Sequence, residues 1–235
     1  RFTTASVMNL SGPLKGTDHV KTKFSTDGSR TRGTNNNCGN GYTPWGTYLT
    51  CEENWPGIFV NKGTRPADQV RIGVATTAGN YEWETAAGDA TEVNDEFGRF
   101  NITPRGAAAT DDYRNEASTY GYIVEIDPYD SSTLPVKRTA LGRFRHEGCW
   151  PGLTTVGKPV VFYMGDDSQN EYLYKFVSTA LWEAADATPT NRLATGAKYM
   201  DSGKLYVSRF NADGSGDWLL LDVITPTTDG STLGA

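Results

Sequence analysis

The stretch "NNNCGNGYTPWGTYLTCEENW", residues 35–55, joins two segments of very different composition. Asn and Gly surround Cys38 and predict a loop, because these residues favour turn conformations. The aromatic and β-branched run "PWGTYLTC" that follows predicts a β-strand, and it leads directly into the adjacent carboxylates Glu52 and Glu53. One predicted strand therefore separates a thiol in a polar loop from two carboxylates at a strand end.

The rest of the chain also favours β structure. Of the 235 residues, 26 are Gly and 11 are Pro, which indicates many turns and short elements. Aromatic and β-branched residues alternate with polar ones in five segments: 57–63, 120–130, 159–167, 171–179 and 203–216. Their spacing predicts an all-β fold of the β-propeller type, with a β-sandwich as the alternative. We expect one domain over 1–235, one helix at 178–187, and long loops or insertions over 62–112.

Charge and hydropathy exclude several classes of protein. The net charge of -6 argues against nucleic-acid binding, which needs clustered Lys and Arg, and it suits multivalent cations. No apolar run approaches the roughly 20 residues that span a bilayer, so no membrane span is predicted. The chain begins with Arg1 rather than Met, and both ends resemble the middle of a longer sequence. We therefore expect a processed product or a fragment.

The three cysteines, Cys38, Cys51 and Cys149, leave at least one thiol unpaired. Cys38 could be a free surface thiol, half of a disulfide, or a thiolate metal ligand. Glu52 and Glu53 could be solvated, or both could reach one site from a strand end. With only two His in the chain, a histidine-rich metal centre is excluded. An oxygen-rich, thiol-containing metal site remains the candidate.

Two further segments carry candidate site residues. The segment "RHEGCW" places Arg145 near Glu147. These two could form a salt bridge, or Arg145 could bind phosphate while Glu147 binds a metal. The segment "YMGDDSQNEY" places Asp166 and Asp167 after a predicted strand. Such a pair is commonly part of a turn and less commonly binds calcium.

Four phrases, in order along most of the chain, resemble the PhoX family of secreted bacterial alkaline phosphatases. They are "NNCGNGYTPWGTYLTCEENW", "YGYIVEIDPYDSSTLPVKRTALGRFRHEG", "VVFYMGDDSQNEYLYKFVS" and "SRFNADGSGDWLLL". The resemblance implies a six-bladed β-propeller that is exported to the periplasm or the cell exterior and hydrolyses small-molecule phosphomonoesters as a monomer. It also implies a central site with two Fe³⁺ and three Ca²⁺ ions.

The resemblance implies roles for individual residues as well. Cys38 resembles the iron-binding cysteine, Glu53 resembles the glutamate ligand of the "CEEN" segment, and Glu116 best matches the glutamate before "YGYIVEIDP". Tyr122 stands where the family has an aromatic residue, usually Trp, near the phosphate. The expected site residues are Cys38, Glu53 and Glu116 for catalysis, Tyr122, Arg145 and Thr17 for substrate binding, and Cys38, Glu52, Glu53, Glu116, Glu147 and Asp166 for metal binding.

The chain also departs from the family pattern. It is far shorter and lacks the "DRPE" motif, which supplies a phosphate-binding Arg and a metal-binding Glu, so we expect the N-terminal part of a longer polypeptide. Where the family often presents Asn or His to phosphate, this chain has Thr17 or Asp18. The leading prediction is a metal-dependent phosphomonoesterase. The alternative is a non-catalytic, calcium-stabilised propeller with a binding or structural role, and unpaired edge strands could support assembly.

Overall fold

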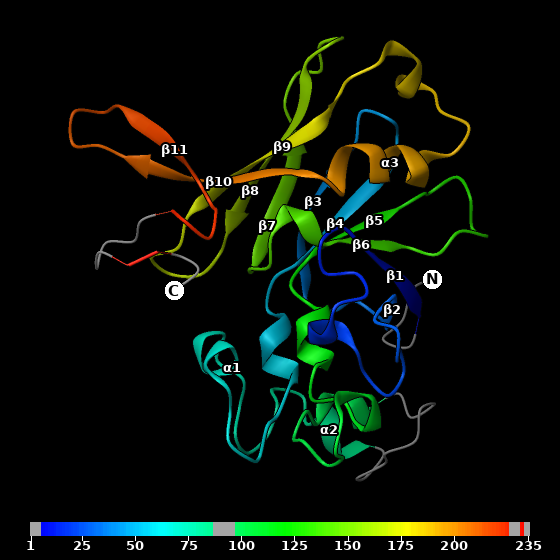
Figure 1. Cartoon of the computed structure of the whole chain (residues 1–235), viewed down its shortest axis with the longest axis vertical. Helices are drawn as coiled ribbons and strands as arrows, with labels where there is room; N and C mark the ends of the chain where they lie inside the picture. Colours follow the sequence, from blue (N-terminus) through cyan, green and yellow to red (C-terminus); the bar gives the residue numbers. More distant parts are fainter. Residues whose placement is uncertain (1–5, 87–96, 226–230, 233–235) are drawn as a thin grey trace.

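The computed structural model describes residues 6–86, 97–225 and 231–232, and these residues form eleven β-strands and three α-helices (Figure 1). The strands are β1 (Val7–Ser11), β2 (Arg30–Arg32), β3 (Asn37–Tyr42), β4 (Tyr48–Glu52), β5 (Ile123–Ile126), β6 (Val136–Arg138), β7 (His146–Pro151), β8 (Pro159–Asp166), β9 (Leu173–Leu181), β10 (Gly203–Phe210) and β11 (Gly216–Leu220). The α-helices are α1 (Ala67–Arg71), α2 (Trp83–Ala86) and α3 (Arg192–Met200). Short 3-10 helices connect them: η1 (Asp18–Val20), η2 (Trp55–Ile58), η3 (Gly98–Phe100), η4 (Ala109–Asp111), η5 (Glu116–Thr119), η6 (Thr139–Leu141) and η7 (Ala184–Ala187).

Six strands form the first sheet, in the order β2-β1-β6-β5-β4-β3. Neighbouring strands are antiparallel except β1 and β6, which pair in parallel. Two ion pairs are buried in this sheet: Lys137 with Glu52 at 2.7 Å, and Arg138 with Glu125 at 2.5 Å. Because a buried charge is costly without a partner, each of these side chains depends on the other member of its pair.

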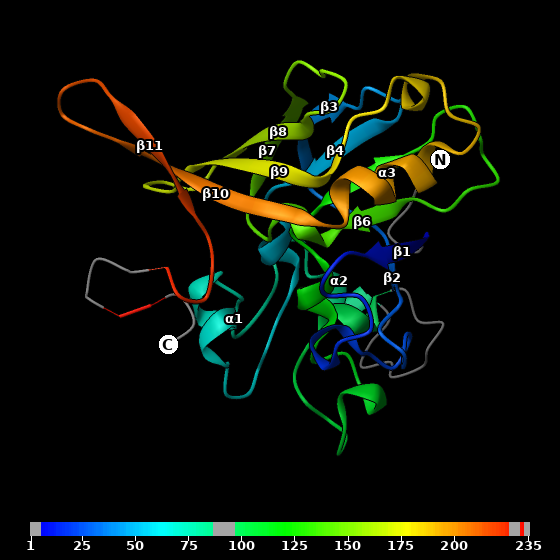
Figure 2. The same cartoon turned by 45° about the horizontal axis from the view of Figure 1, so that its top comes forward.

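Five strands form the second sheet, an antiparallel meander in the order β11-β10-β9-β8-β7. The hairpin of β10 and β11 is closed by the turn "NADGSG". There the Asn211 amide donates a hydrogen bond to the Ser215 carbonyl at 2.9 Å, and Gly214 has a φ of 85°. This positive φ is the reason that the turn contains Gly. The hairpin projects away from the rest of the molecule (Figure 2).

The two sheets meet where β3 lies against β7. Two glycines of β3 make this contact possible. A Cβ added to Gly39 would lie 2.2 Å from the amide nitrogen of Gly148, and a Cβ added to Gly41 would lie 1.7 Å from the carbonyl oxygen of Cys149. Only glycine fits at such distances. The loop predicted around Cys38 is therefore wrong: its glycines allow two strands to approach closely.

The main hydrophobic core lies between the two sheets and α3. Its aromatic members include Trp45, Phe162, Phe176 and Tyr199, all at most 1% exposed. The Trp45 ring stacks on Tyr199 with 5.4 Å between the ring centroids, and its indole N–H donates a hydrogen bond to Glu125 at 2.8 Å. Aromatic side chains bury large areas, so these contacts hold α3 against the sheets.

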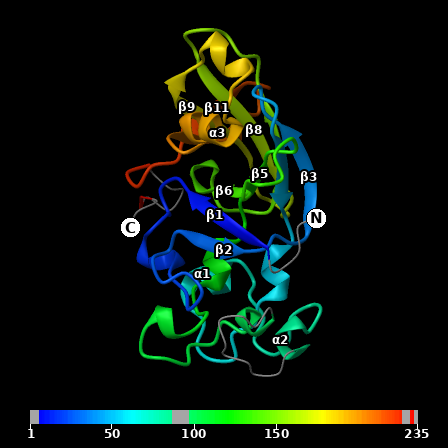
Figure 3. The same cartoon turned by 90° about the vertical axis from the view of Figure 1, so that its right-hand side faces the viewer.

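A second hydrophobic cluster lies within the long connection between β4 and β5. Trp55, Phe59, Phe100 and Tyr120 are its large members, all at most 1% exposed. Figure 3 shows this part of the chain, with α1 and α2, on one side of strands β1 and β2, and α3 on the other. The β4–β5 connection thus has a core of its own.

The predicted six-bladed β-propeller is wrong for this chain. The described residues form two open sheets of six and five strands, and neither sheet closes into a ring. A propeller repeats four-stranded blades around a central channel, whereas here β6 lies between β1 and β5 and pairs with β1 in parallel. β structure does predominate as predicted, but strand spacing is a local signal and carries no information on which distant strands pair.

The helix predicted at 178–187 is also wrong. β9 continues to Leu181 because it pairs with both β8 and β10, and η7 follows it. The α-helix of this region is α3, which begins after Asn191, whose side chain accepts a hydrogen bond from the Ala194 amide at 3.0 Å. Among the described residues, no helix is long and apolar enough to cross a membrane.

The strand predicted at 57–63 is not formed. η2 occupies its first residues, and Val60 makes only isolated bridges with Ala75 and Asn101. The other four predicted strand segments are confirmed by β5, β8, β9 and the hairpin of β10 and β11. Of the segment 62–112, residues 87–96 lie outside the described part, and the remainder contains α1, α2, η3 and η4.

Candidate metal centre and adjacent pocket

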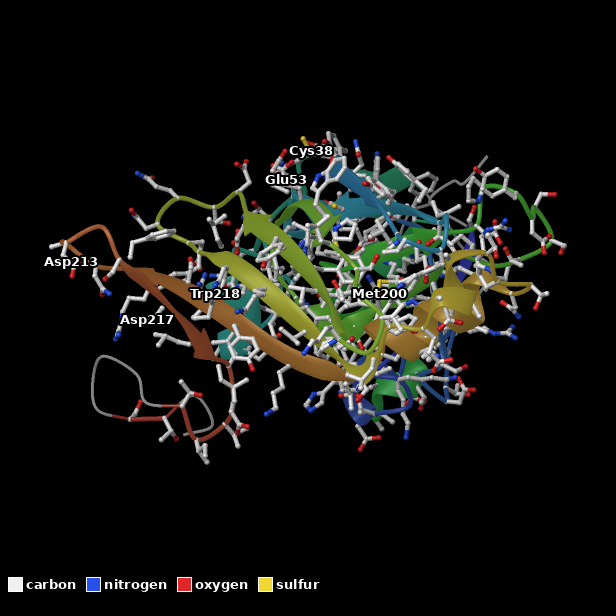
Figure 4. All side chains as sticks on the ribbon, turned by 90° about the horizontal axis from the view of Figure 1, so that it is seen from above. Cys38, Glu53, Met200, Asp213, Asp217 and Trp218 are labelled. Carbon is white, nitrogen blue, oxygen red and sulfur yellow. The ribbon has the colours of Figure 1, made fainter. Side chains whose placement is uncertain are left out.

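Three of the predicted ligands converge where the two sheets meet. One ligand atom each of Cys38, Glu53 and Glu147 lies within 4.8 Å of the other two. Cys38 comes from β3, Glu53 directly follows β4, and Glu147 belongs to β7. Figure 4 shows Cys38 and Glu53 next to each other at the edge of the molecule. We call the three ligand side chains of Cys38, Glu53 and Glu147 the metal cluster. Glu53 is buried while the other two are exposed, so a cation could reach the metal cluster from solvent.

The backbone is irregular on both strands that carry the exposed ligands. The pairing of β3 with β4 shifts register between Asn37 and Asn40, around Cys38. The pairing of β7 with β8 shifts directly after Glu147, where Gly148 has a φ of 85°. Because a β-bulge redirects side chains, both ligands leave the regular strand alternation at the point where the two strands meet.

Negative charge is concentrated in the metal cluster. Hydrogen bonding to Glu53, and the charges of Glu53 and Glu147, raise the pKa of the Cys38 thiol to about 11. Desolvation, followed by the charges of Glu53 and Asp167, raises the pKa of Glu147. A bound cation would relieve this repulsion and favour the ionised forms. One sulfur and several carboxylate oxygens form a donor set that fits iron and calcium.

The other two cysteines have a structural role. Cys51 and Cys149 are fully buried in the main core. Burial raises the pKa of Cys51 to about 12 and that of Cys149 well above its usual value, which keeps both as neutral thiols. All three cysteines of the chain are free, so neither core thiol forms a disulfide with Cys38.

Glu52 is adjacent to Glu53 but is engaged within the first sheet. Its carboxylate accepts hydrogen bonds from Lys137 Nζ at 2.7 Å, from the Gly121 amide at 2.8 Å and from the Tyr122 amide at 3.1 Å. Both the carboxylate and the ammonium group are fully buried. Since these partners satisfy the carboxylate, we assign Glu52 to the sheet rather than to a metal.

Glu116 is likewise held within the protein. Its side chain is 2% exposed, and one carboxylate oxygen lies 3.1 Å from the Arg99 guanidinium. Burial raises the pKa of Glu116, and the charges of Arg99, Arg32 and Lys137 oppose that effect. The structure does not bring this carboxylate into the metal cluster, although both a catalytic and a metal-binding role were predicted for it.

Tyr122 and Thr17, the two predicted phosphate contacts outside "RHEGCW", also bond within the protein. Tyr122 is fully buried, its hydroxyl donates a hydrogen bond to the Ser118 carbonyl at 2.9 Å, and burial raises its pKa. Thr17 precedes η1, and its hydroxyl donates to the Leu14 carbonyl at 2.9 Å. Neither residue belongs to the metal cluster.

A pocket of about 560 Å³ lies beside the metal cluster, lined by residues of η2 and α1, the residues directly before β7, the end of β8 with the loop after it, and β9. Arg145 lines it and directly precedes β7, two residues before Glu147. Asp167 also lines the pocket. Its amide donates a hydrogen bond to the Arg145 carbonyl at 3.0 Å, and its charge acts on Glu147. These two residues connect the metal cluster to the pocket.

Asp166, a predicted metal ligand, lies in the pocket rather than in the metal cluster. Its carboxylate accepts a hydrogen bond from the Ser168 amide at 3.0 Å, which is turn chemistry. Burial raises the pKa of Asp166, while the nearby charge of Arg145 lowers it.

Some residues of the pocket were not predicted. Arg71 in α1 forms an ion pair with Glu171, which also lines the pocket, and no local pattern connects two residues so far apart in sequence. Arg143 donates hydrogen bonds to the carbonyls of Tyr120 at 3.0 Å and Ala117 at 2.8 Å. The alternation in "RFR" was a signal that Arg143 and Arg145 share one side of the chain.

Comparison with known proteins points to one family. The family model "Alkaline phosphatase PhoX" matches residues 1–233. The solved structure of Pseudomonas fluorescens PhoX in complex with vanadate, a transition state analogue, is similar, with 36% sequence identity and a TM-score of 0.78. The match covers 98% of this chain and 37% of that chain, so this chain spans about 37% of the length of that relative. Comparison with curated proteins gave no match.

Proposed function

Because the chain belongs to the PhoX family of alkaline phosphatases, we propose that it supplies a cation site for the metal-dependent hydrolysis of phosphomonoesters to inorganic phosphate. The observation that carries this proposal is the convergence of Cys38, Glu53 and Glu147 within 4.8 Å. Three residues from three strands place a sulfur and two carboxylates at one accessible point. Small-molecule phosphomonoesters are the proposed substrates.

The donor set suits ferric iron at Cys38 and calcium at the carboxylates. Thiolate sulfur favours iron, while calcium is bound by carboxylate oxygen. The crowding that raises the pKa values of Cys38 and Glu147 favours the binding of a cation, which would hold both groups ionised. Two Fe³⁺ and three Ca²⁺ ions need more ligands than these three residues offer, so Cys38, Glu53 and Glu147 are proposed as one part of such a set.

The side chains of this chain would bind and orient the ester. When bound, the cations would polarise the phosphoryl oxygens and supply a water molecule of lowered pKa. Arg145 is half-buried in the pocket wall on the side of Glu147, and its guanidinium forms no ion pair with another described residue. Its planar fork suits two phosphoryl oxygens and would share their charge. Buried Glu53 would help to hold the cation.

The protein is further proposed to be exported and to act as a monomer in the periplasm or outside the cell. The family resemblance supports this part of the proposal. Cell fractionation measures the location, and the mass in solution measures the oligomeric state. Recovery in the cytoplasm, or a mass that exceeds one chain, would contradict it.

Metal content and hydrolysis of a chromogenic phosphomonoester test the proposed function together. The natively purified protein should contain iron and calcium and should release phosphate. Replacing Cys38→Ser should remove the iron and lower the activity at least about tenfold. Replacing Cys51→Ala removes a buried thiol outside the metal cluster and should leave the iron in place. A protein with neither iron nor activity would overturn the proposal.

A non-catalytic, calcium-stabilised binding or structural role is the second candidate. Its support is that Glu52 and Glu116, two expected ligands, are paired with Lys137 and Arg99 instead. In that case the protein should contain no iron and hydrolyse no phosphomonoester. Calcium should raise the midpoint temperature of its thermal unfolding, and chelation of calcium should lower it. Hydrolysis by the iron-loaded protein would exclude this candidate.

A further inference from the structure

The pocket beside the metal cluster presents polar groups that the rest of the described chain leaves without a hydrogen bond. The carboxylates of Asp68 and Asp167 are exposed, line the pocket and accept no hydrogen bond from another described residue. Tyr174 lines it too, and its hydroxyl has no such partner in the described part of the chain. Together with Arg145, the wall therefore offers both acceptors and donors. This combination matches a ligand whose groups each donate and accept, as a hydroxyl does.

Neighbouring groups already cover ring faces of Phe144 and Trp55 in the pocket wall. Phe144 stacks on Tyr174 at 4.1 Å and on His146 at 3.7 Å between ring centroids, so neighbouring rings cover both of its faces. The guanidinium of Arg143 lies over the Trp55 ring, 4.6 Å from its centroid. The faces of Phe144 are therefore closed to a flat aryl group, and an alkyl chain would leave the polar wall unpaired.

The pocket is placed where the alcohol part of an ester would lie. Arg145 lies two residues before Glu147, at most about 7 Å along the chain, and it also lines the pocket. A phosphate between the metal cluster and Arg145 would therefore lie next to the pocket. The volume of about 560 Å³ is within the range of sites for small molecules.

We propose that this pocket binds the alcohol part of the substrate and selects a polyhydroxylated one, so that sugar and sugar-alcohol monophosphates are preferred over alkyl and aryl monophosphates. This inference rests on the proposed function and adds the substrate class to it. Asp68 and Asp167 accept hydrogen bonds from the hydroxyls of the ligand, and Tyr174 donates one. Asp68 and Tyr174 are specificity-determining residues and take no part in the chemical step.

Two six-carbon esters separate this proposal from the alternatives. Sorbitol 6-phosphate and n-hexyl phosphate are both primary alkyl monophosphates that differ in their hydroxyl groups. For the metal-loaded protein, kcat/KM should be about tenfold higher for sorbitol 6-phosphate, which corresponds to one or two net hydrogen bonds. The variants Tyr174→Phe and Asp68→Ala should each lose several-fold of this value for sorbitol 6-phosphate and leave n-hexyl phosphate unchanged. Tyr172→Phe is the matched control, since Tyr172 is exposed, neighbours Tyr174 and does not line the pocket.

Binding of the two esters, measured by calorimetry, gives a readout that does not depend on turnover. If the protein hydrolyses both esters equally well, or if the pocket variants change neither ester, the substrate preference is overturned while the proposed function stands. If the protein hydrolyses neither ester, the proposed function fails. The calorimetric binding of the two esters then tests the pocket assignment by itself. Weaker binding of sorbitol 6-phosphate to Tyr174→Phe then supports the pocket assignment, and unchanged binding overturns it.

Discussion

Cys38 and Glu147 belong to different sheets, and their ligand atoms lie within 4.8 Å of each other. This proximity depends on the approach of β3 to β7, which Gly39 and Gly41 permit because they lack a Cβ. The candidate metal centre is therefore a property of the junction between the sheets. A change that separates the two strands should also separate the ligands.

Replacing Gly41→Ala tests the dependence on this junction. The added Cβ would lie 1.7 Å from the Cys149 carbonyl oxygen, so β3 and β7 must move apart. Forced overpacking of this kind costs about 1–3 kcal/mol. We expect urea denaturation to show a loss of that size, and the iron content of the purified variant to fall.

Gly152→Ala is the control for this substitution. Its added Cβ would be 3.5 Å from the Tyr163 ring, an ordinary contact distance. Stability and iron content should therefore match those of the unmodified protein. Unchanged stability and full iron content in Gly41→Ala would show that the close approach is not required.

Neither Lys137 nor Glu52 should be replaceable alone, because each is the buried partner of the other, and neither should be needed for metal binding. Burial lowers the pKa of Lys137, and the charge of Glu52 opposes that effect. Lys137→Met leaves Glu52 buried without its counter-charge and should lower the free energy of unfolding by about 3–5 kcal/mol. Adding Glu52→Gln should restore most of this loss. Iron content should be the same in the double variant, and loss of iron there would make Glu52 a ligand.

Asp112 should make the stability of the protein depend on pH. Burial acts to raise its pKa, but hydrogen bonds from Arg114 and from the amides of Gly106 and Arg105 outweigh it, and the pKa is lowered. The folded value lies below the unfolded one. The contribution to stability is therefore fully present above about pH 4 and is lost as the pH falls through the folded value.

The variant Asp112→Asn removes this dependence. At pH 7 we expect its free energy of unfolding to be lower by about 1 kcal/mol or more, because a charged acceptor of several hydrogen bonds is lost. The difference between the two proteins should shrink as the pH falls below about 4. Urea denaturation at pH 3, 5 and 7 measures it, and a constant difference across this range would contradict the assignment.

Sequence patterns predicted the strands whose neighbours are close in sequence. The meander of β8, β9, β10 and β11 follows alternating segments separated by recognisable turns, and each strand pairs with the next. The first sheet was harder to predict for two reasons. β6 pairs with β1, a strand far from it in the sequence, and β2 and β6 have only three residues each. The propeller prediction failed at this long-range pairing.

In the candidate site, too, residues close in sequence could be predicted to lie together, and contacts between distant segments could not. Cys38 and Glu53 were predicted together because one strand joins them, and Glu147 followed from its place in "RHEGCW". The sequence could not show that Glu52 and Glu116 meet Lys137 and Arg99, since those cations lie on distant segments. The three-dimensional neighbours of each glutamate, and not its sequence context, decide whether it forms an ion pair or belongs to the candidate metal site.

X-ray absorption at the iron edge of the natively purified protein tests the metal centre most directly. Iron should have a sulfur scatterer in its first coordination shell. Cys38→Ser should remove this scatterer, whereas Cys51→Ala should retain it. An iron shell of oxygen and nitrogen alone in the unmodified protein, or a sulfur signal that survives in Cys38→Ser, would contradict the assignment of the metal centre to the junction of β3 and β7.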